Sequence, residues 1–448
     1  MRQSSTIVAL LLSLVAGNSA MAQVKDADGA PGADPFDALK DIPLSRNGEV
    51  SVSFGGQLRV RPEFSRNPVF GLAAPQRNDG LLVRTYLSAD LQIGQYLKTY
   101  VELVSGQVPA WNGTPPSIQL DRLDLLQGYG ELVLPSAVGG IMLRGGRQEM
   151  SFGSSRLISV RESPNVRRSF DGVRAAWVAS PDFRIDAFVT RPVLPQPGVF
   201  DDKSDPAQAF WGVYGTSGVP GIPELKLDFY YLGLDRENAR FAQGTANEHR
   251  HTVGGRLFGQ ASGFDWNVEA AYQFGQFGQA GIQAWTVSAN VGYTFANLPF
   301  SPRLGVNADA ISGDSNLKDG KLGTFNPLFP KLPYFSEANL AGPANLLDVQ
   351  PNVTLTLLPE LTLNLGWNPL WKQAKADAFY GPAITPVAGT AGGAGRYVGQ
   401  QFSTTLEWKA TDHLTIGGTY VNYIPGERIR EAGGKSGSFA AGWATFSF

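Results

Sequence analysis

Apolar residues alternate with polar or small ones along most of this chain, in segments of about ten residues. In the first segment Phe54, Leu58 and Val60 fall on one face, and Arg59 and Arg61 fall on the other. A period of two indicates strands and not helices. About ten residues is also the length of a tilted strand that crosses a bilayer. A soluble sandwich would show the same local alternation, so the pattern alone predicts only β-structure.

The connections between these segments favour a membrane barrel over a sandwich. Short links such as residues 94–96, 180–182 and 358–360 alternate with long ones such as 151–170 and 312–345. Short periplasmic turns and long external loops produce this alternation in a barrel, whereas a sandwich has no need of it. We therefore predict an all-β fold, a transmembrane antiparallel up-and-down β-barrel of about 18 strands with both termini periplasmic. A miscount of one hairpin would give about 16 strands, and either number leaves an aqueous channel.

The two ends of the chain indicate export and membrane insertion. Arg2, an apolar core over 7–15 and the small residues 20–22 predict a signal peptide at residues 1–22. Residues 23–49 are expected to form a polar periplasmic arm, and 50–448 the barrel. No later apolar run approaches the about 20 residues that a transmembrane helix needs. The aromatic C-terminal residue Phe448 resembles the ending of outer-membrane barrels, so we expect the protein in the bacterial outer membrane.

Composition narrows the classes of function. Charged residues are 17% of the chain, below the roughly 25% of soluble domains, and glycine is high at 53 of 448. The absence of cysteine excludes thiol catalysis, disulfides and thiolate metal sites. A formal net charge of −2 gives no indication of a nucleic-acid partner.

The polar members of the alternation are the candidates for the lumen. The basic candidates are Arg59, Arg61, Arg84, Lys98, Arg144, Arg174, Lys226, Arg250 and Arg256. The acidic ones are Asp90, Glu102, Asp186, Asp228 and Glu269. The segment 145–174 is the richest in arginine, and a loop of this kind could fold into the barrel and line its constriction. Rings of arginine select anions. Alternatively, these arginines pair with neighbouring acids or with lipopolysaccharide phosphates at the outer rim.

The same segment carries a family resemblance. It contains "GGRQE" at 145–149, "FGSSRL" at 152–157 and "PNVRRSFDGVR" at 164–174, and "ADAISGD", "TFNPLFP" and "GPANLLDVQPNVTL" follow at 308–314, 324–330 and 342–355. In this order the motifs resemble the alginate export family of outer-membrane barrels. The resemblance implies a monomeric barrel of 18 strands with an electropositive conduit for a polyuronate. It marks as anion-binding candidates Arg147, Arg161, Arg167, Arg168 and Arg174.

Three functions remain open from the sequence. The leading one is a passive, anion-selective channel that exports an acidic polysaccharide such as alginate or its oligomers. The second is a substrate-selective porin that takes up small anionic solutes, and the third is an outer-membrane barrel enzyme. Besides the transported anion, we expect lipid and lipopolysaccharide as partners. Docking of periplasmic secretion components onto the turns is left open.

Motifs for catalysis and ligand binding are few. His249 and His251 lie two residues apart, but no further ligand is spaced to complete a metal site. The loop aspartates Asp201, Asp202 and Asp205, with Asp314 and Asp319, could bind calcium, although solvated loop charge is the favoured interpretation. We therefore predict no cofactor, no metal and no enzymatic activity.

Overall fold

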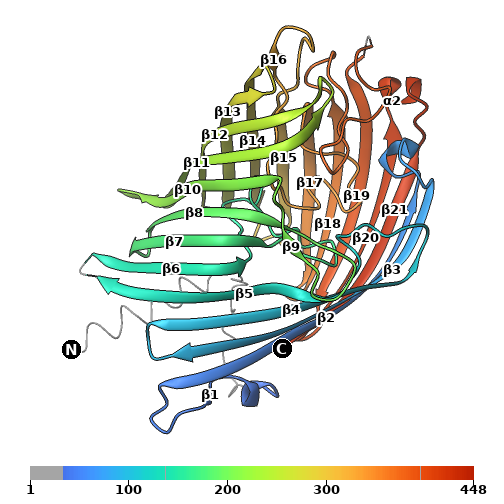
Figure 1. The fold of residues 1–448 in the computed structure, drawn as a ribbon. Coiled ribbons are helices and arrows are strands. Elements are labelled where there is room, and N and C mark those ends of the chain that lie inside the picture. Colours follow the sequence, from blue (N-terminus) through green and yellow to red (C-terminus); the bar gives the residue numbers. More distant parts are fainter. Residues whose placement is uncertain (1–33, 137, 394) are drawn as a thin grey trace.

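The computed structural model describes residues 34–448 except 137 and 394, so the predicted signal peptide lies outside the described residues. Within the described part, 21 strands join one sheet in which sequential neighbours pair antiparallel. The last strand pairs with the first long one, Leu58 opposite Phe446, which closes the sheet into a barrel (Figure 1). The short strands β1 (Ile42–Pro43), β9 (Lys203–Ser204) and β16 (Lys321–Leu322) are additions to it, which leaves eighteen strands in the barrel wall.

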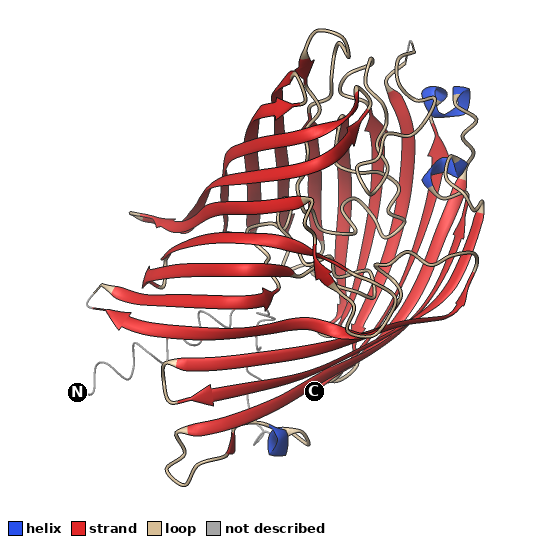
Figure 2. Ribbon diagram, viewed as in Figure 1, coloured by secondary structure: helices blue, strands red, loops and turns tan. Residues whose placement is uncertain are grey.

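The wall strands follow one another around the barrel in chain order. They are β2 (Val50–Arg66), β3 (Arg77–Ile93), β4 (Leu97–Trp111), β5 (Asp121–Ser136), β6 (Gly139–Gln148), β7 (Phe170–Ser180), β8 (Phe183–Leu194), β10 (Gln208–Val219), β11 (Ile222–Phe241), β12 (Gly244–Ala261), β13 (Phe264–Phe277), β14 (Ala280–Thr294), β15 (Arg303–Ile311), β17 (Leu346–Leu358), β18 (Leu361–Trp371), β19 (Tyr397–Lys409), β20 (Leu414–Pro425) and β21 (Gly437–Ser447). The predicted all-β barrel is confirmed, and its eighteen wall strands agree with the predicted number. Helix is confined to the short elements η1 (Asp37–Leu39), η2 (Val69–Gly71) and α2 (Glu427–Glu431) among the described residues (Figure 2).

The two faces of the wall have opposite chemistry. Large apolar side chains are exposed on the outer face, for example Val173 at 60% and Val189 at 62%. Charged side chains on the inner face are buried, and Arg84 and Arg250 are at most 1% exposed. An apolar exterior around a polar interior is the arrangement of a barrel whose solvent is lipid. None of the described helices is long and apolar enough to cross a membrane.

The turns and loops correct one expectation. One end of the barrel holds the start of β2 and the turn 94–96 between β3 and β4. The connections at this end are short, as predicted. At the other end, however, residues 242–243 and 278–279 form two-residue connections, so the alternation of short and long links is not strict. Strands β11 and β12 are long, with 20 and 18 residues. Their hairpin therefore extends as paired strands over a length where other hairpins have already become loops.

The described part of the N-terminal arm packs against the barrel near the C-terminus. Ile42 and Pro43 pair with Val52 and Ser51 of β2. The Phe36 ring stacks on Phe448 with 5.1 Å between ring centroids. Residues 34–49 therefore lie along the short-turn end of the wall.

Candidate pore constriction

The loop between β6 and β7, residues 149–169, crosses the lumen. Its first half contacts β13, where the Ser154 hydroxyl donates to Glu269 at 2.6 Å. Its second half contacts β3, where the Tyr86 hydroxyl donates to the carbonyl of Asn165 at 3.0 Å. Around the closed wall, β3 and β13 lie almost opposite one another. The predicted folding of this segment into the barrel is therefore what the structure shows, and Figure 2 shows tan loops within the ring of strands.

A second loop, residues 312–345 between β15 and β17, runs beside the first one. The two loops pair at Ile158 and Phe329, and the Phe329 amide donates to the carbonyl of Leu157 at 2.9 Å. Ile158 and Phe329 are 1% and 6% exposed, within an apolar cluster that includes Phe210 and Tyr230 of the wall. Because apolar side chains fill the contact between loops and wall, the loops narrow the channel as one packed unit.

Two arginines of the wall bind the main chain of the first loop. Arg84 donates to the carbonyl of Glu162 at 2.9 Å and forms an ion pair with its carboxylate at 2.5 Å. Arg59 donates to the carbonyls of Ser163 and Pro164 at 2.8 and 3.0 Å. Each guanidinium satisfies several carbonyls that would otherwise lack donors in a buried place. Both arginines therefore hold the loop against β2 and β3.

Arg167 lies among the acids of the constriction. Its guanidinium is 2.7 Å from Glu149 and 3.3 Å from Glu102, and it packs over the Tyr86 ring. Glu162 adds a third carboxylate at 3.6 Å. The charge of Arg167 is therefore compensated locally.

Among the described residues, three arginines of the constriction have no carboxylate within 4 Å. They are Arg59, described above, and Arg161 and Arg168. Arg168 donates to the carbonyls of Ser159 and Pro330 and packs over the Phe329 ring. Burial lowers the pKa of Arg161 to about 10, and burial with the neighbouring charge of Arg161 lowers the pKa of Arg168. Guanidinium groups keep their proton in proteins, so both add positive charge at neutral pH.

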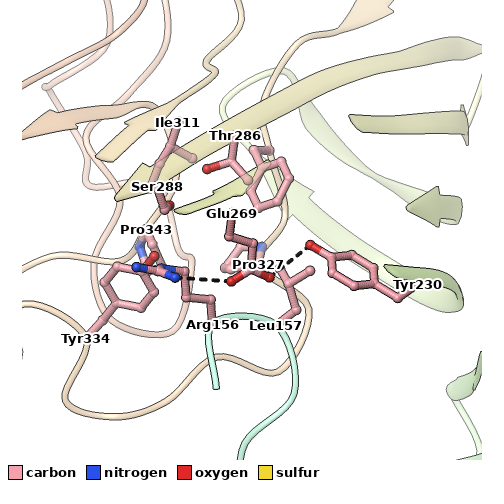
Figure 3. Close-up of a pocket in the computed structure, with 11 residues that line it drawn as sticks. Arg156, Leu157, Tyr230, Glu269, Thr286, Ser288, Ile311, Pro327, Tyr334 and Pro343 are labelled. Carbon is pink, nitrogen blue, oxygen red and sulfur yellow. Dashed lines mark hydrogen bonds and ion pairs between the residues drawn. The ribbon is translucent and has the colours of Figure 1, made fainter. Parts of the chain in front are cut away.

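A small pocket lies where the two loops meet β11, β13, β14 and β15 (Figure 3). Arg156 forms an ion pair with Glu269 at 3.1 Å, and the Tyr230 hydroxyl donates to the same carboxylate at 2.9 Å. Tyr334 from the second loop closes the pocket and donates to Asp309 at 3.4 Å. The pocket is lined by groups that already bond one another, so it connects the loops to the wall.

A belt of charges follows the inner wall from β3 to β8. Arg144 and Arg174 lie directly opposite one another on β6 and β7. Each has an acid on its other side, with Glu131 at 2.5 Å from Arg144 and Asp186 at 2.7 Å from Arg174. The belt continues to β3 and β4, where Lys98 and Asp90 pair at 2.5 Å.

The remaining predicted residues also form ion pairs on the inner side. Arg256 pairs with Asp228 at 2.6 Å, and Arg147 pairs with Asp171 at 2.8 Å. Arg61 bridges to Glu337 of the second loop at 2.7 Å. The last two pairs are those of Arg250 with Glu248 and of Lys226 with Asp182. The structure thus brings Arg59, Arg84, Arg161, Arg167 and Arg168 together at the constriction and distributes the others around the wall.

Sequence reasoning missed most of the partners of these arginines. Glu162 and Glu337 lie in loops, where strand alternation gives no information. The second loop was regarded as external, although its "TFNPLFP" segment places Phe325 and Phe329 in the interior at 2% and 6% exposure. Large apolar side chains within a long loop were the signal that could have indicated an inward fold.

The histidines and loop aspartates considered as ligands in the sequence do not come together at one place. His249 is exposed on β12 and pairs with Asp235 at 2.8 Å, and His251 contacts Tyr231 at 2.8 Å on the outer face. Among the described residues, the acids that come close enough to share an ion are Asp124, Asp201 and Asp202. Asp205, Asp314 and Asp319 do not join this group and accept hydrogen bonds within their own loops.

Comparison with known proteins agrees with this geometry. The alginate export family model matches residues 50–442. OccK8 (OprE) of Pseudomonas aeruginosa has a similar structure, with a TM-score of 0.58 at 11% identity over 89% of this chain and 98% of that one. OccAB1 of Acinetobacter baumannii gives 0.59 at 10% identity over 92% and 98%. OpdK of P. aeruginosa, solved with vanillate, gives 0.56 at 9% identity over 88% and 98%.

No curated protein matches the chain in sequence. The solved structures share its fold at identities too low to carry a substrate over. The family model, in contrast, extends over almost the whole barrel, from the first wall strand into the last. The chain therefore belongs to the alginate export family, and it is an outer-membrane β-barrel channel.

Proposed function

We propose that this barrel is an anion-selective, passive conduit that exports an acidic polysaccharide such as alginate or its oligomers. The observation that carries the proposal is the set of three arginines at the constriction, Arg59, Arg161 and Arg168, that have no carboxylate partner among the described residues. Positive charge that forms no ion pair with a carboxylate attracts anions into a narrow, low-dielectric passage. Membership of the alginate export family supports a polyuronate as the anion.

The paired arginines contribute in a different way. In the belt of Arg144, Arg174, Glu131 and Asp186, two adjacent arginines lie between two acids along the wall. A uronate unit carries a carboxylate and several hydroxyl groups; a guanidinium donates to both, and a wall carboxylate accepts from the hydroxyl groups. The belt therefore offers weak, repeated contacts along which a sugar chain can slide without being held.

The experiment is a conductance measurement on the purified full-length mature protein in planar bilayers. An anion-preferring reversal potential in a salt gradient is expected, with block by oligouronates and not by neutral oligosaccharides of equal length. A cation preference together with no block by oligouronates would contradict the proposal. Flux of fluorescent oligouronate out of loaded liposomes, compared with a neutral oligosaccharide, tests whether the polymer itself passes.

The second candidate is uptake of small anionic solutes. It is favoured by the packing of the two loops, because Ile158 and Phe329 are almost fully buried in the contact that narrows the lumen. A passage narrowed in this way suits a small acid better than a polymer. The structural similarity to OpdK, solved with vanillate, agrees with this candidate. Liposomes that accumulate a small aromatic acid but exclude oligouronates would favour uptake over export.

A further inference from the structure

Four carboxylates meet at the long-loop end of β5. Asp121 and Asp124 are the first and fourth residues of that strand, and Asp201 and Asp202 belong to the loop between β8 and β10. The loop and the strand are joined by backbone contacts, since the amides of Asp201 and Asp202 both donate to one Asp124 oxygen at 2.7 and 2.9 Å. Oxygen atoms of Asp124, Asp201 and Asp202 all lie within 4.8 Å of one another.

Asp121 is the observation that points to a ligand. Its side chain is 0% exposed, and neither carboxylate oxygen has a hydrogen-bond partner. The charged side chains that act most strongly on it are Asp202, Asp124 and Asp201. A buried carboxyl group without a hydrogen-bond partner lowers the stability of the fold. The two unpartnered oxygens of Asp121 therefore belong to a side chain whose electrostatic neighbours are the three clustered acids.

Local cations do not compensate this charge. The nearest is Arg147, at 3.7 Å from Asp124, and its guanidinium makes its closer contacts with Asp171 at 2.8 Å. The Arg147 guanidinium also donates to the main-chain carbonyl of Asp202 at 3.3 Å. One shared arginine against four acidic side chains leaves the cluster with a net negative charge.

We propose that Asp124, Asp201 and Asp202, with the neighbouring Asp121 carboxyl group, bind one divalent cation of the calcium type. Calcium takes six to eight oxygen ligands from carboxylates, carbonyls and water in flexible geometry, at about 2.3–2.6 Å. Four carboxylates from two segments supply the charge for such an ion, and its insertion would give the free oxygens of Asp121 a partner. Magnesium fits less well, because it requires near-octahedral geometry and keeps most of its waters.

The ion would fasten the β8–β10 loop to the wall. That loop also carries Ser204, whose hydroxyl donates to the same Asp171 that pairs with Arg147. An ion at this place therefore stabilises the loop and, through it, the ion pair on the inner wall. Calcium binding at this place does not depend on which substrate the channel passes, so its test is separate from that of the proposed function.

The test uses the mature protein refolded from inclusion bodies into detergent, so that the sample contains no lipopolysaccharide. Bound metal is first removed with a chelator. Calcium binding is measured by titration calorimetry, and thermal unfolding is recorded with calcium, with magnesium and without either ion. One calcium ion should bind each chain and raise the unfolding temperature. In the double variant Asp201→Asn, Asp202→Asn, affinity should fall roughly tenfold or more, because two charged ligands are lost.

Two further variants make the result decisive. Asp121→Asn should unfold at a higher temperature than the wild type without calcium, since it removes a repulsive charge, and should gain less from calcium. Asp319→Asn, in the β15–β17 loop and outside the cluster, should bind calcium as the wild type does. The assignment is overturned if the wild type binds no calcium, if it prefers magnesium, or if the double variant binds calcium unchanged.

Discussion

The guanidinium of Arg84 on β3 and the carboxylate of Glu162 in the β6–β7 loop form an ion pair 2.5 Å long on the inner side of the barrel. The same guanidinium donates to the carbonyls of Glu162 and Pro164 at 2.9 and 3.2 Å. Arg84 is 1% exposed, whereas the Glu162 side chain is 57% exposed. The buried wall residue therefore holds a loop whose acid faces the channel.

Replacement of Arg84 by methionine should release this half of the loop. The substitution keeps much of the volume but removes every donor, and loss of hydrogen bonds from a charged group should cost about 3 kcal/mol. That is roughly a hundredfold in the equilibrium between docked and undocked loop. Single-channel recordings should show larger and more variable conductance than the wild type. Arg77→Met is the control on the same strand, since Arg77 is 66% exposed at the rim, and it should leave conductance unchanged.

Replacement of Glu131 by glutamine should destabilise the charge belt. Arg144 and Arg174 lie opposite one another, and without Glu131 only Asp186 would remain beside the two. Removing one partner of a buried ion pair costs about 3–5 kcal/mol. Unfolding in denaturant, followed by circular dichroism, should show a midpoint lower than that of the wild type. An unchanged midpoint, equal to that of the exposed turn variant Glu360→Gln, would contradict this role.

Replacement of Val189 by arginine tests which face meets the lipid. Val189 is 62% exposed on β8, with an apolar neighbour, Val173, directly opposite on β7. An arginine on the lipid face of a barrel costs about 2–4 kcal/mol near the bilayer midplane and less near its surfaces. Folding into lipid vesicles should therefore be weakened, while Gln95→Arg in a short turn should have little effect. Equal folding of both variants would mean that this face does not contact lipid.

The wall could be predicted from the sequence because the alternation of outward apolar and inward polar residues is visible within each single strand. In β2, Leu58 and Val60 are 45% and 38% exposed, while Arg59 and Arg61 are 5% and 4% exposed, as alternation requires. The lipid outside and the charged lumen inside apply the same two-residue period along every strand. The strand number followed from the same pattern combined with the lengths of the connections.

The constriction could be predicted only in part. The arginine content of the β6–β7 loop indicated that it folds inward, but no period links Arg84 to Glu162, which is 78 residues away. Nor does any local rule pair Arg61 with Glu337, which belongs to the loop between β15 and β17. Such pairs depend on the path of each loop through the lumen, which the packing of Ile158 on Phe329 determines.

The most direct test of the account is the reversal potential of the wild type and of the triple variant Arg59→Gln, Arg161→Gln, Arg168→Gln in the same salt gradient. Glutamine keeps donors for the carbonyls that Arg59 and Arg168 bind but removes the three positive charges that form no ion pair. The account predicts anion preference in the wild type, a clear shift toward cations in the variant, and weaker block by oligouronates. A wild type without anion preference, or a variant with the same reversal potential, would contradict it.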